Sequence, residues 1–350
     1  MNVLTIEAAT NLLGEILDPI INIPLKETGG IKEVTIKEEK EHVSVKIAMA
    51  KLGGQPQLDL QTKIVETLKA NGARTVGLRF EQLEDAALEQ FRAETGSEIE
   101  RQLKNTEFIS IASGKGGVGK STVSVNLAVA LARLGKKVGL VDADIYGFSV
   151  PDMMGITSRP GINGQMIVPV ERFGVKVISM AFFVEENTPV IWRGPMLGKM
   201  INNFFREVEW GELDYILLDL PPGTGDVALD VHEMLPKSKE IVVTTPHPTA
   251  AFVAARAGAM ALHTNHDILG VVENMSYFES RETGNREYVF GTGGGEKLAD
   301  ELNTELIGQL PLAQPDWNEY DFAPSVYAAD HPLGIIYRNM AAKVIEKTEK

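Results

Sequence analysis

The sequence contains no cysteine among its 350 residues. Without a thiol, the chain cannot form a disulfide, supply a thiolate nucleophile, or ligate zinc or an iron–sulfur cluster through cysteine. The sequence also lacks a run of about 18 apolar residues, the length that a membrane-spanning helix needs. Its first residues, MNVLTIEAATNLLGEIL, have no basic start and carry acids within the apolar run, unlike a signal peptide. We therefore expect a cytoplasmic protein that does not associate with a membrane.

Basic residues are outnumbered. The chain has 34 lysines and arginines against 48 aspartates and glutamates, which gives a formal net charge of −14. Non-specific binding to nucleic acid depends largely on neutralising phosphates with basic side chains. The composition therefore argues against a general nucleic-acid coat protein, although it leaves room for a local basic patch.

The length predicts two domains, because 350 residues exceed one ordinary core. Residues 1–80 show helical periodicity followed by alternating apolar positions, which predicts a small α+β domain. Residues 81–106 hold seven acids against three bases and few large apolar groups, which is typical of a solvated linker. Residues 107–350 form the second predicted domain.

The second domain contains short apolar runs separated by predicted helices. Continuous apolarity, rather than alternation, indicates strands that are covered on both faces. We therefore predict an α/β fold with a doubly wound, mostly parallel sheet. The predicted strands are Phe108–Ala112, Val138–Val141, Val175–Met180, Tyr215–Leu220, Ile241–Thr244, Ile268–Val272 and Leu306–Leu310.

The stretch GKGGVGKS, Gly114–Ser121, fits the phosphate-loop pattern G-x-x-x-x-G-K-[ST] between a predicted strand and a predicted helix. Glycines allow successive backbone N–H groups to turn toward phosphate oxygens, and the helix adds its positive end. Lys120 is expected to bridge the β- and γ-phosphates, and the Ser121 hydroxyl to ligate Mg²⁺. The alternative is a glycine turn with a chance lysine. The expected nucleotide-binding residues here are Gly114, Lys115, Gly116, Gly117, Val118, Gly119, Lys120, Ser121 and Thr122.

The loop carries a second lysine, Lys115. KGGVGKS resembles the deviant phosphate loop of a class of dimerising ATPases that includes nitrogenase iron protein and the septum-positioning ATPases. The resemblance implies that Lys115 reaches across a two-fold interface to the nucleotide of the partner subunit. A second cation there stabilises negative charge in the transition state. We therefore expect a homodimer in which Lys115, Lys120 and Asp144 are catalytic; the alternative for Lys115 is a solvated lysine.

Two aspartate-bearing segments complete the predicted site. VDADIYG presents Asp142 and Asp144 at the carboxyl end of a strand, where ligands bind in such sheets. By resemblance, Asp144 belongs to switch I and orients the attacking water, with Asp142 nearby on the metal side. Asp219 ends the apolar run YILLD as a Walker B aspartate does, so Ser121, Asp142 and Asp219 form the predicted Mg²⁺ site, the two aspartates through water. Helix capping is the alternative for Asp142 and Asp219.

The residues after Asp219 are predicted to form switch II, whose backbone can approach the γ-phosphate. This loop comprises Pro222, Gly223, Thr224, Gly225 and Asp226. Asn274 ends a later strand in GVVENMS. The wider class uses an asparagine here for purines, so the resemblance assigns Asn274 to the adenine edge; the alternative is an asparagine that caps a turn.

Further segments resemble one family within this class. DIYGFSVPDMMG, WRGPM, WGELDYILLDLPPGTGD and FGTGGGEKLA are together similar to the Mrp/ApbC family of P-loop ATPases, known for carrying iron–sulfur clusters. Residues 1–80 resemble the small iron–sulfur assembly domain that often precedes it. The resemblance implies ATP and Mg²⁺ as cofactors, and slow ATP hydrolysis that depends on dimerisation.

The carrier members of that family share a C-x-x-C pair after the NMS segment, and two subunits pool these pairs to hold one cluster. In this chain the corresponding positions fall on Ser280 and Thr283. Neutral hydroxyls are poor ligands for iron compared with thiolates. We therefore regard these as vacant cluster-ligand positions and expect no iron–sulfur cluster.

In lacking cysteine, the chain resembles a branch of the family whose members are described as ATP-responsive, DNA-binding transcriptional regulators. Our preferred hypothesis is therefore a regulator with promoter DNA as its partner. Arg281, Arg286 and Lys297 could form a modest basic patch in a dimer, although a solvated surface is the alternative. A second hypothesis is an iron–sulfur cluster carrier or assembly ATPase, which the missing C-x-x-C pair disfavours. A third is a positioning ATPase that acts on a protein partner, possible through residues 1–80.

Overall fold

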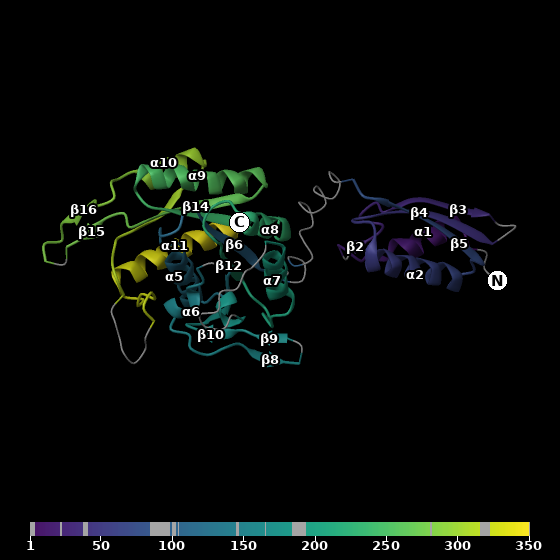
Figure 1. The fold of residues 1–350 in the computed structure, drawn as a ribbon, viewed down its shortest axis with the longest axis horizontal. Helices are drawn as coiled ribbons and strands as arrows, with labels where there is room; N and C mark the ends of the chain where they lie inside the picture. The colour runs from purple at the N-terminus through teal and green to yellow at the C-terminus, as the bar shows by residue number, and fades with distance from the viewer. Residues whose placement is uncertain are drawn as a thin grey trace. The chain divides into compact units, whose positions relative to one another are not determined.

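The structure is a computed structural model of the chain, and Figure 1 shows its fold. The described residues are 4–21, 23–37, 41–84, 99, 103, 105–144, 147–164, 166–183, 194–280, 282–315 and 323–349. The chain divides into two compact units, Met1–Arg101 and Gln102–Lys350. Most of the predicted linker, namely residues 85–98, 100–102 and 104, lies outside the described residues.

The N-terminal unit packs two helices against a three-stranded sheet. In the sheet, β3 pairs antiparallel with β4, and β4 pairs parallel with β5. The elements are α1 (Ile6–Gly14), β1 (Leu17–Asp18), β2 (Ile23–Pro24), β3 (Ile31–Lys37), β4 (His42–Met49), α2 (Gly54–Ala70) and β5 (Thr75–Gln82). This unit therefore combines helices with a sheet, while the predicted domain boundaries at residues 80 and 106 stay predictions.

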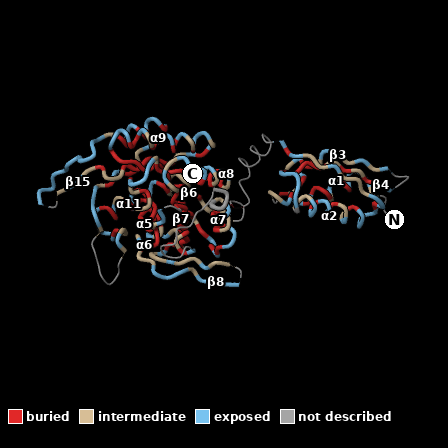
Figure 2. Tube along the Cα trace, in the orientation of Figure 1, coloured by how far each residue is buried: buried red, intermediate tan, exposed pale blue. Residues whose placement is uncertain are grey.

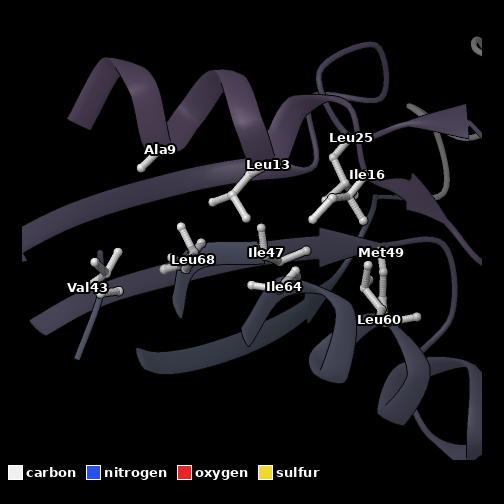
Figure 3. Close-up of a cluster of buried hydrophobic side chains, with 12 residues drawn as sticks. Ala9, Leu13, Ile16, Leu25, Val43, Ile47, Met49, Leu60, Ile64 and Leu68 are labelled. Atoms are coloured by element: carbon white, nitrogen blue, oxygen red, sulfur yellow. The ribbon is translucent and has the colours of Figure 1, made fainter. Parts of the chain in front are cut away.

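The core of this unit follows from the apolar periodicities of its sequence (Figure 3). Alternate residues of β4, from Val43 to Met49, are buried in it. Leu60, Ile64 and Leu68 join them from α2, because a spacing of four residues returns to the same face of a helix. Each such buried aliphatic side chain contributes about 2 kcal/mol of hydrophobic stabilisation.

The C-terminal unit is built on an eight-stranded sheet with the order β10-β11-β7-β12-β6-β13-β14-β17. Every neighbouring pair is parallel except β10 and β11. The strands are β6 (Glu107–Ser113), β7 (Val138–Asp142), β10 (Val170–Arg172), β11 (Val175–Ser179), β12 (Tyr215–Asp219), β13 (Lys239–Thr244), β14 (Asp267–Asn274) and β17 (Leu306–Leu310). The seven predicted strands are therefore confirmed. The antiparallel edge strand β10 was not predicted.

Helices cover both faces of this sheet (Figure 1). On one face, α5 (Lys120–Arg133) packs on β6, β7 and β12 beside α11 (Pro332–Thr348). On the other, α9 (Pro248–His263) packs on β13 and β14 beside α10 (Gly294–Glu301). The central strands are consequently buried, as Figure 2 shows for β6 and β7. This confirms the predicted doubly wound sheet.

Shorter elements connect these layers. They are α6 (Val150–Met153), the hairpin β8 (Gly161–Asn163) and β9 (Met166–Val168), the 3₁₀ turn η2 (Met180–Phe183), α7 (Gly194–Arg206), α8 (Asp226–Met234), and the hairpin β15 (Phe278–Glu279) and β16 (Arg286–Glu287). Among the described residues, the structure contains no helix that is both long and apolar enough to span a membrane.

Candidate nucleotide site

The predicted site lies where three parallel strands end. In β12 and β7, Asp219 and Asp142 occupy directly paired positions, and Asp219 also pairs with Ile111 of β6. Because parallel strands present their carboxyl ends at one edge, the phosphate loop after β6 meets both aspartates there. The order of the strands therefore assembles residues that are far apart in the sequence.

The phosphate loop has the backbone conformations that its glycines allow. Gly117 and Gly119 have φ values of 80° and 82°, in the left-handed region that favours glycine. Gly114 packs so tightly against α9 that a Cβ atom there would lie 2.3 Å from the carbonyl carbon of Val253. After Gly119 the chain enters α5 at Lys120, so the helix N-terminus opens at the loop. This arrangement suits the binding of phosphate.

Lys120, Ser121 and Asp219 form a buried polar cluster beneath the loop. The Nζ atom of Lys120, whose side chain is 6% exposed, lies 2.8 Å from Oδ1 of Asp219. The Ser121 hydroxyl donates to Oδ2 of the same carboxylate at 2.6 Å. Hydroxyl and carboxylate oxygens are ligands that Mg²⁺ prefers, so this donor set fits the predicted metal.

A pocket of about 680 Å³ opens above this cluster. Its volume is within the range of small-molecule and cofactor sites. It is lined by Ser113, Lys115, Gly116, Gly117, Val118, Gly119, Lys120, Ser121, Asp144, Gly147, Met153, Pro221, Pro222, Gly225, Asp226 and Val227. Residues predicted from the phosphate loop, switch I and switch II are thus brought together around one space.

Lys115 lines the same pocket but differs from Lys120 in its surroundings. Lys120 is buried, whereas Lys115 is exposed. Among the described residues, Lys115 has no ion pair with a side chain of this chain. Its position is therefore open to an anionic group from outside the chain, which its proposed role in trans requires.

Asp144 and Asp142 differ in what they contact. Asp144 is mostly buried, lines the pocket, and has a carboxylate oxygen 3.8 Å from Nζ of Lys120. Asp142 is fully buried, and its carboxylate accepts hydrogen bonds from the Ser179 hydroxyl at 2.9 Å and from the backbone N–H groups of Val150 and Asp144 at 3.3 Å each. Asp142 thus holds the backbone that follows β7.

The electrostatics of Asp142 follow from this burial. Loss of water, reinforced by the nearby carboxylate of Asp219, raises the pKa of Asp142 to about 7, while the Ser179 hydrogen bond and the Lys120 charge oppose that rise. The hydrogen bonds of Asp142 connect it to the switch I backbone, while those of Asp219 connect it to the phosphate loop. Metal binding through water by Asp142 stays a prediction.

The predicted switch II loop is tied to the phosphate-loop strand. The backbone N–H of Gly223 donates to the carbonyl oxygen of Ser113 at 2.7 Å, and Gly223 has a φ of 90°. Pro222, Gly225 and Asp226 line the pocket, and Thr224 is exposed. Asp226 begins α8, so this loop leads directly into that helix.

Asn274 supports the loop rather than lining the pocket. Its side-chain amide donates to the carbonyl oxygen of Val118 at 2.9 Å. One amide hydrogen and the amide oxygen remain for other partners. Contact of Asn274 with adenine therefore stays a prediction, beside the loop contact that the sequence did not predict. Thr122 follows Ser121 on α5, where its carbonyl oxygen accepts from Asn126.

Ser280 and Thr283 lie in the turn between β15 and β16. The Ser280 hydroxyl accepts from the N–H of Thr283, and the Thr283 hydroxyl accepts from the N–H of Asn285, both at 3.3 Å. The turn is also closed by the N–H of Gly284, which donates to the Ser280 carbonyl at 2.8 Å. The two hydroxyls therefore stabilise the turn by accepting from backbone N–H groups of the chain itself. They do not match the thiolates that ligate an iron–sulfur cluster.

Two further observations concern metal binding by the described residues and DNA binding near this turn. Within the described ranges, no group of three or more histidine, cysteine, aspartate or glutamate residues could hold a metal ion. Of the predicted basic patch, Arg281 lies outside the described residues, and Arg286 is paired with Glu279 at 2.8 Å. This ion pair reduces the positive charge that the hairpin could offer to DNA.

Sequence reasoning missed three serines that support the site. The Ser124 hydroxyl donates to Asp219 at 2.5 Å, the Ser179 hydroxyl donates to Asp142, and the Ser113 hydroxyl donates to the carbonyl oxygen of Lys115 in the phosphate loop at 3.2 Å. Each is a small polar residue in or beside a run of buried apolar residues. That signal marks a buried hydrogen bond, but it does not identify the partner.

Comparison with known proteins gives consistent matches. The sequence model of the family described as "ParA: NUBPL iron-transfer P-loop NTPase" matches residues 104–345. An iron–sulfur cluster carrier protein from Bacillus subtilis (strain 168) is 64% identical over 340 residues, covering 96% of each chain. Another, from Mycobacterium bovis, is 42% identical over 327 residues, covering 87% of this chain and 83% of the relative. Among solved structures, a nucleotide-binding protein from Archaeoglobus fulgidus in complex with ADP has a TM-score of 0.55 and 36% identity, covering 70% of this chain and 91% of that chain.

Proposed function

Because this chain belongs to the ParA/NUBPL family of iron-transfer P-loop NTPases, we propose that it is a Mg²⁺-dependent ATPase that serves iron–sulfur cluster transfer, with the cluster ligated by thiolates of another protein. The curated relatives at 64% and 42% identity are named iron–sulfur cluster carrier proteins. Their names favour the carrier hypothesis over the DNA-binding regulator that the sequence analysis preferred.

The observation that carries the ATPase proposal is the cluster of Lys120, Ser121 and Asp219 beneath a glycine loop. The loop N–H groups and the start of α5 favour the polyphosphate of ATP. With nucleotide and metal bound, Lys120 would contact the β- and γ-phosphates, and Ser121 and Asp219 would hold Mg²⁺. The chemistry that Mg²⁺ would supply there is neutralisation of charge on the phosphate oxygens. Asp144, beside Lys120 in the pocket, orients the attacking water.

Dimerisation completes the proposed site. Lys115 is exposed, lines the pocket and is available to an anion from another chain. We infer that two copies enclose two ATP molecules and that each Lys115 contacts the γ-phosphate held by its partner. A cation placed there stabilises the charge that develops during phosphoryl transfer. After hydrolysis, the switch loops lose their phosphate contacts and the dimer loosens.

The cargo sets a further condition. The sequence has no cysteine, and the hydroxyls of Ser280 and Thr283 are engaged in their own turn. A cluster that this ATPase handles is therefore a substrate whose thiolate ligands belong to the donor or the acceptor protein. In this role the nucleotide state of the chain controls its association with those proteins, and residues 1–80 offer a separate unit for such contact.

The test distinguishes ATP hydrolysis from the binding and transfer of an iron–sulfur cluster. Purified chain is assayed for phosphate release with ATP and Mg²⁺, then incubated anaerobically with iron and sulfide. We expect hydrolysis and a colourless protein after desalting. In a third assay, addition of the chain and ATP accelerates cluster transfer from a cysteine-ligated scaffold to an apo-ferredoxin. A coloured protein would overturn ligation by other proteins, and an unchanged transfer rate would overturn the carrier role.

A DNA-binding regulator remains the second proposal, because a chain without thiolates has no ligand set of its own for a cluster. Its test is a gel-shift assay with promoter DNA, with and without ATP, over a range of salt concentrations. Binding through phosphate contacts would weaken steeply as salt rises. A positioning ATPase would respond in neither assay, but its hydrolysis would rise when its protein partner is added.

A further inference from the structure

Ser124 lies outside the phosphate-loop motif, one helical turn after Lys120 on α5. It is fully buried, and it is absent from the residues that line the pocket. Its hydroxyl oxygen is 2.5 Å from Oδ1 of Asp219 and 3.1 Å from the carbonyl oxygen of Lys120. Both neighbours are acceptors, and a hydroxyl has a single proton to donate.

The shorter contact identifies where that proton goes. A hydrogen bond from a hydroxyl to a carboxylate is shorter and stronger than one to a neutral carbonyl. The distances of 2.5 Å and 3.1 Å therefore assign the donation to Asp219. We propose that Ser124 is a positioning residue, which fixes the Walker B carboxylate so that the ligands for Mg²⁺ are correctly placed.

The two oxygens of Asp219 have different partners. Ser124 and Lys120 contact Oδ1, whereas the Ser121 hydroxyl contacts Oδ2. Rotation about the last torsion of an aspartate is soft, so the carboxylate needs an external contact to hold one orientation. The bond from Ser124 to Oδ1 supplies that contact, and it keeps Oδ2 facing Ser121, the expected Mg²⁺ ligand.

Binding of Mg²⁺-ATP makes this contact more important. Lys120 and Ser121 are the two donors to Asp219 that would also serve the phosphates and Mg²⁺ in the proposed site. Ser124 is buried behind the carboxylate and does not reach the pocket, so it is the donor that stays. This inference rests on the proposed ATPase site and adds a residue to it that the motif does not include.

The first test uses the unliganded protein, without Mg²⁺ or nucleotide. Unfolding free energies are measured for Ser124→Ala, Asp219→Ala and the double variant. If Ser124 bonds Asp219, Ser124→Ala should change the unfolding equilibrium constant about fivefold less in the Asp219→Ala background than in the wild type. Additive effects would mean that Ser124 bonds only the Lys120 carbonyl, and they would overturn the proposal.

The second test measures Mg²⁺ dependence. We expect Ser124→Ala to raise the Mg²⁺ concentration for half-maximal ATPase activity about tenfold, as loss of an outer partner of a metal site does. Binding of a fluorescent ATP analogue without Mg²⁺ should stay within about twofold of wild type, because Ser124 does not line the pocket and the phosphate loop is untouched. Ser124→Thr restores the hydroxyl and should recover most of the Mg²⁺ affinity.

Ser110→Ala is the matched control. Ser110 is also fully buried, lies on β6 beside β12, and has no hydrogen-bond partner for its hydroxyl. It should leave the Mg²⁺ dependence unchanged. If Ser124→Ala behaves like Ser110→Ala while the wild type hydrolyses Mg²⁺-ATP, the role of Ser124 is wrong and the proposed function stands. If the wild type does not bind Mg²⁺-ATP, the proposed function itself fails.

Discussion

The side-chain amide of Asn274, at the end of β14, donates a hydrogen bond to the carbonyl oxygen of Val118 in the phosphate loop at 2.9 Å. A strand two positions away from β6 in the sheet therefore fixes the loop that follows β6. The contact comes so close to Gly119 that a Cβ atom on that glycine would lie 2.1 Å from the amide nitrogen. Asn274 and Gly119 thus determine the shape of the loop together.

Asn274→Ala should weaken nucleotide binding through the loop. One hydrogen bond of this kind contributes about 1 kcal/mol, so we expect about a fivefold loss of ATP affinity. Tripolyphosphate, which has no base, should show a comparable loss. The measurement is a titration of both ligands by calorimetry. A loss confined to ATP would instead support the contact with adenine that the sequence predicts.

The two central glycines of the loop provide a matched pair. Gly117 and Gly119 share a left-handed backbone, but only Gly119 has an atom within 4 Å of an added Cβ. Gly117→Ala should therefore cost only the conformational penalty of about 1 kcal/mol. Gly119→Ala should cost at least about 2 kcal/mol and displace Asn274. Denaturant unfolding measures both, and equal costs would contradict the assigned contact.

A buried hydrogen-bond network at the carboxyl-terminal ends of α8 and α9 leads to a prediction about how stability depends on pH. The Nε2 atom of His266 is 3.0 Å from the carbonyl oxygen of Leu235, so that nitrogen carries a proton. The Thr264 hydroxyl lies between Nδ1 of His266 and Nδ1 of His232, at 2.9 and 3.0 Å. The same hydroxyl lies 3.0 Å from the carbonyl oxygens of Met260 and Ala261, so Nδ1 of a neutral His266 competes with them for its proton while Nδ1 of His232 donates to it. One proton is then shared between Nε2 of His232 and Glu240, which lie 3.0 Å apart.

Burial raises the pKa of Glu240, with the hydrogen bond to His232 opposing that rise. The folded state then keeps a proton that the unfolded state releases above about pH 4.3, so this group makes stability fall as pH rises from there. Glu240→Gln stays neutral and can still donate to His232. Its unfolding free energy should therefore decline less steeply than that of the wild type between about pH 5 and pH 8.

His266 affects stability in the opposite direction, as the pH falls. Burial is the main cause that lowers the pKa of His266, and repulsion from His232 acts in the same direction only when that ring is protonated. Stability should therefore fall in both proteins as the pH drops through about 6.5, where the unfolded histidine takes up a proton. Denaturant unfolding at a series of pH values tests both arms. A Glu240→Gln variant destabilised by about 3 kcal/mol or more would indicate a charged His232–Glu240 pair instead.

The sequence was sufficient for features that depend on local pattern. Seven apolar runs predicted seven strands of the sheet, and the phosphate-loop motif predicted the backbone that places Lys120 and Ser121 under the pocket. Strand order β7-β12-β6 then brings Asp219 to the same edge. The strands and the loop follow from burial on both faces and from glycine conformations, which a single sequence displays, whereas the order of the strands was not predicted.

The sequence was insufficient for the direction of individual polar groups. Asp142 and Asp219 both end apolar strands, yet Asp142 contacts Ser179 and Asp219 contacts Ser121 and Ser124. In each case the partner serine lies on a different element of the chain, and the fold rather than the local sequence brings the two side chains together. The edge strand β10 was missed because three residues are too short to show a period.

The direct test of the account is complementation between two inactive variants, Lys115→Ala and Lys120→Ala. Each homodimer should be nearly inactive, since the first lacks the lysine given to the partner and the second lacks its own phosphate lysine. In a mixed dimer, the chain that keeps Lys120 receives Lys115 from the other chain. Mixing equal amounts should therefore restore about a quarter of wild-type ATP hydrolysis, because half of the dimers regain one of two sites. Activity that stays at the level of the separate variants would show that Lys115 serves its own chain, and it would contradict the account.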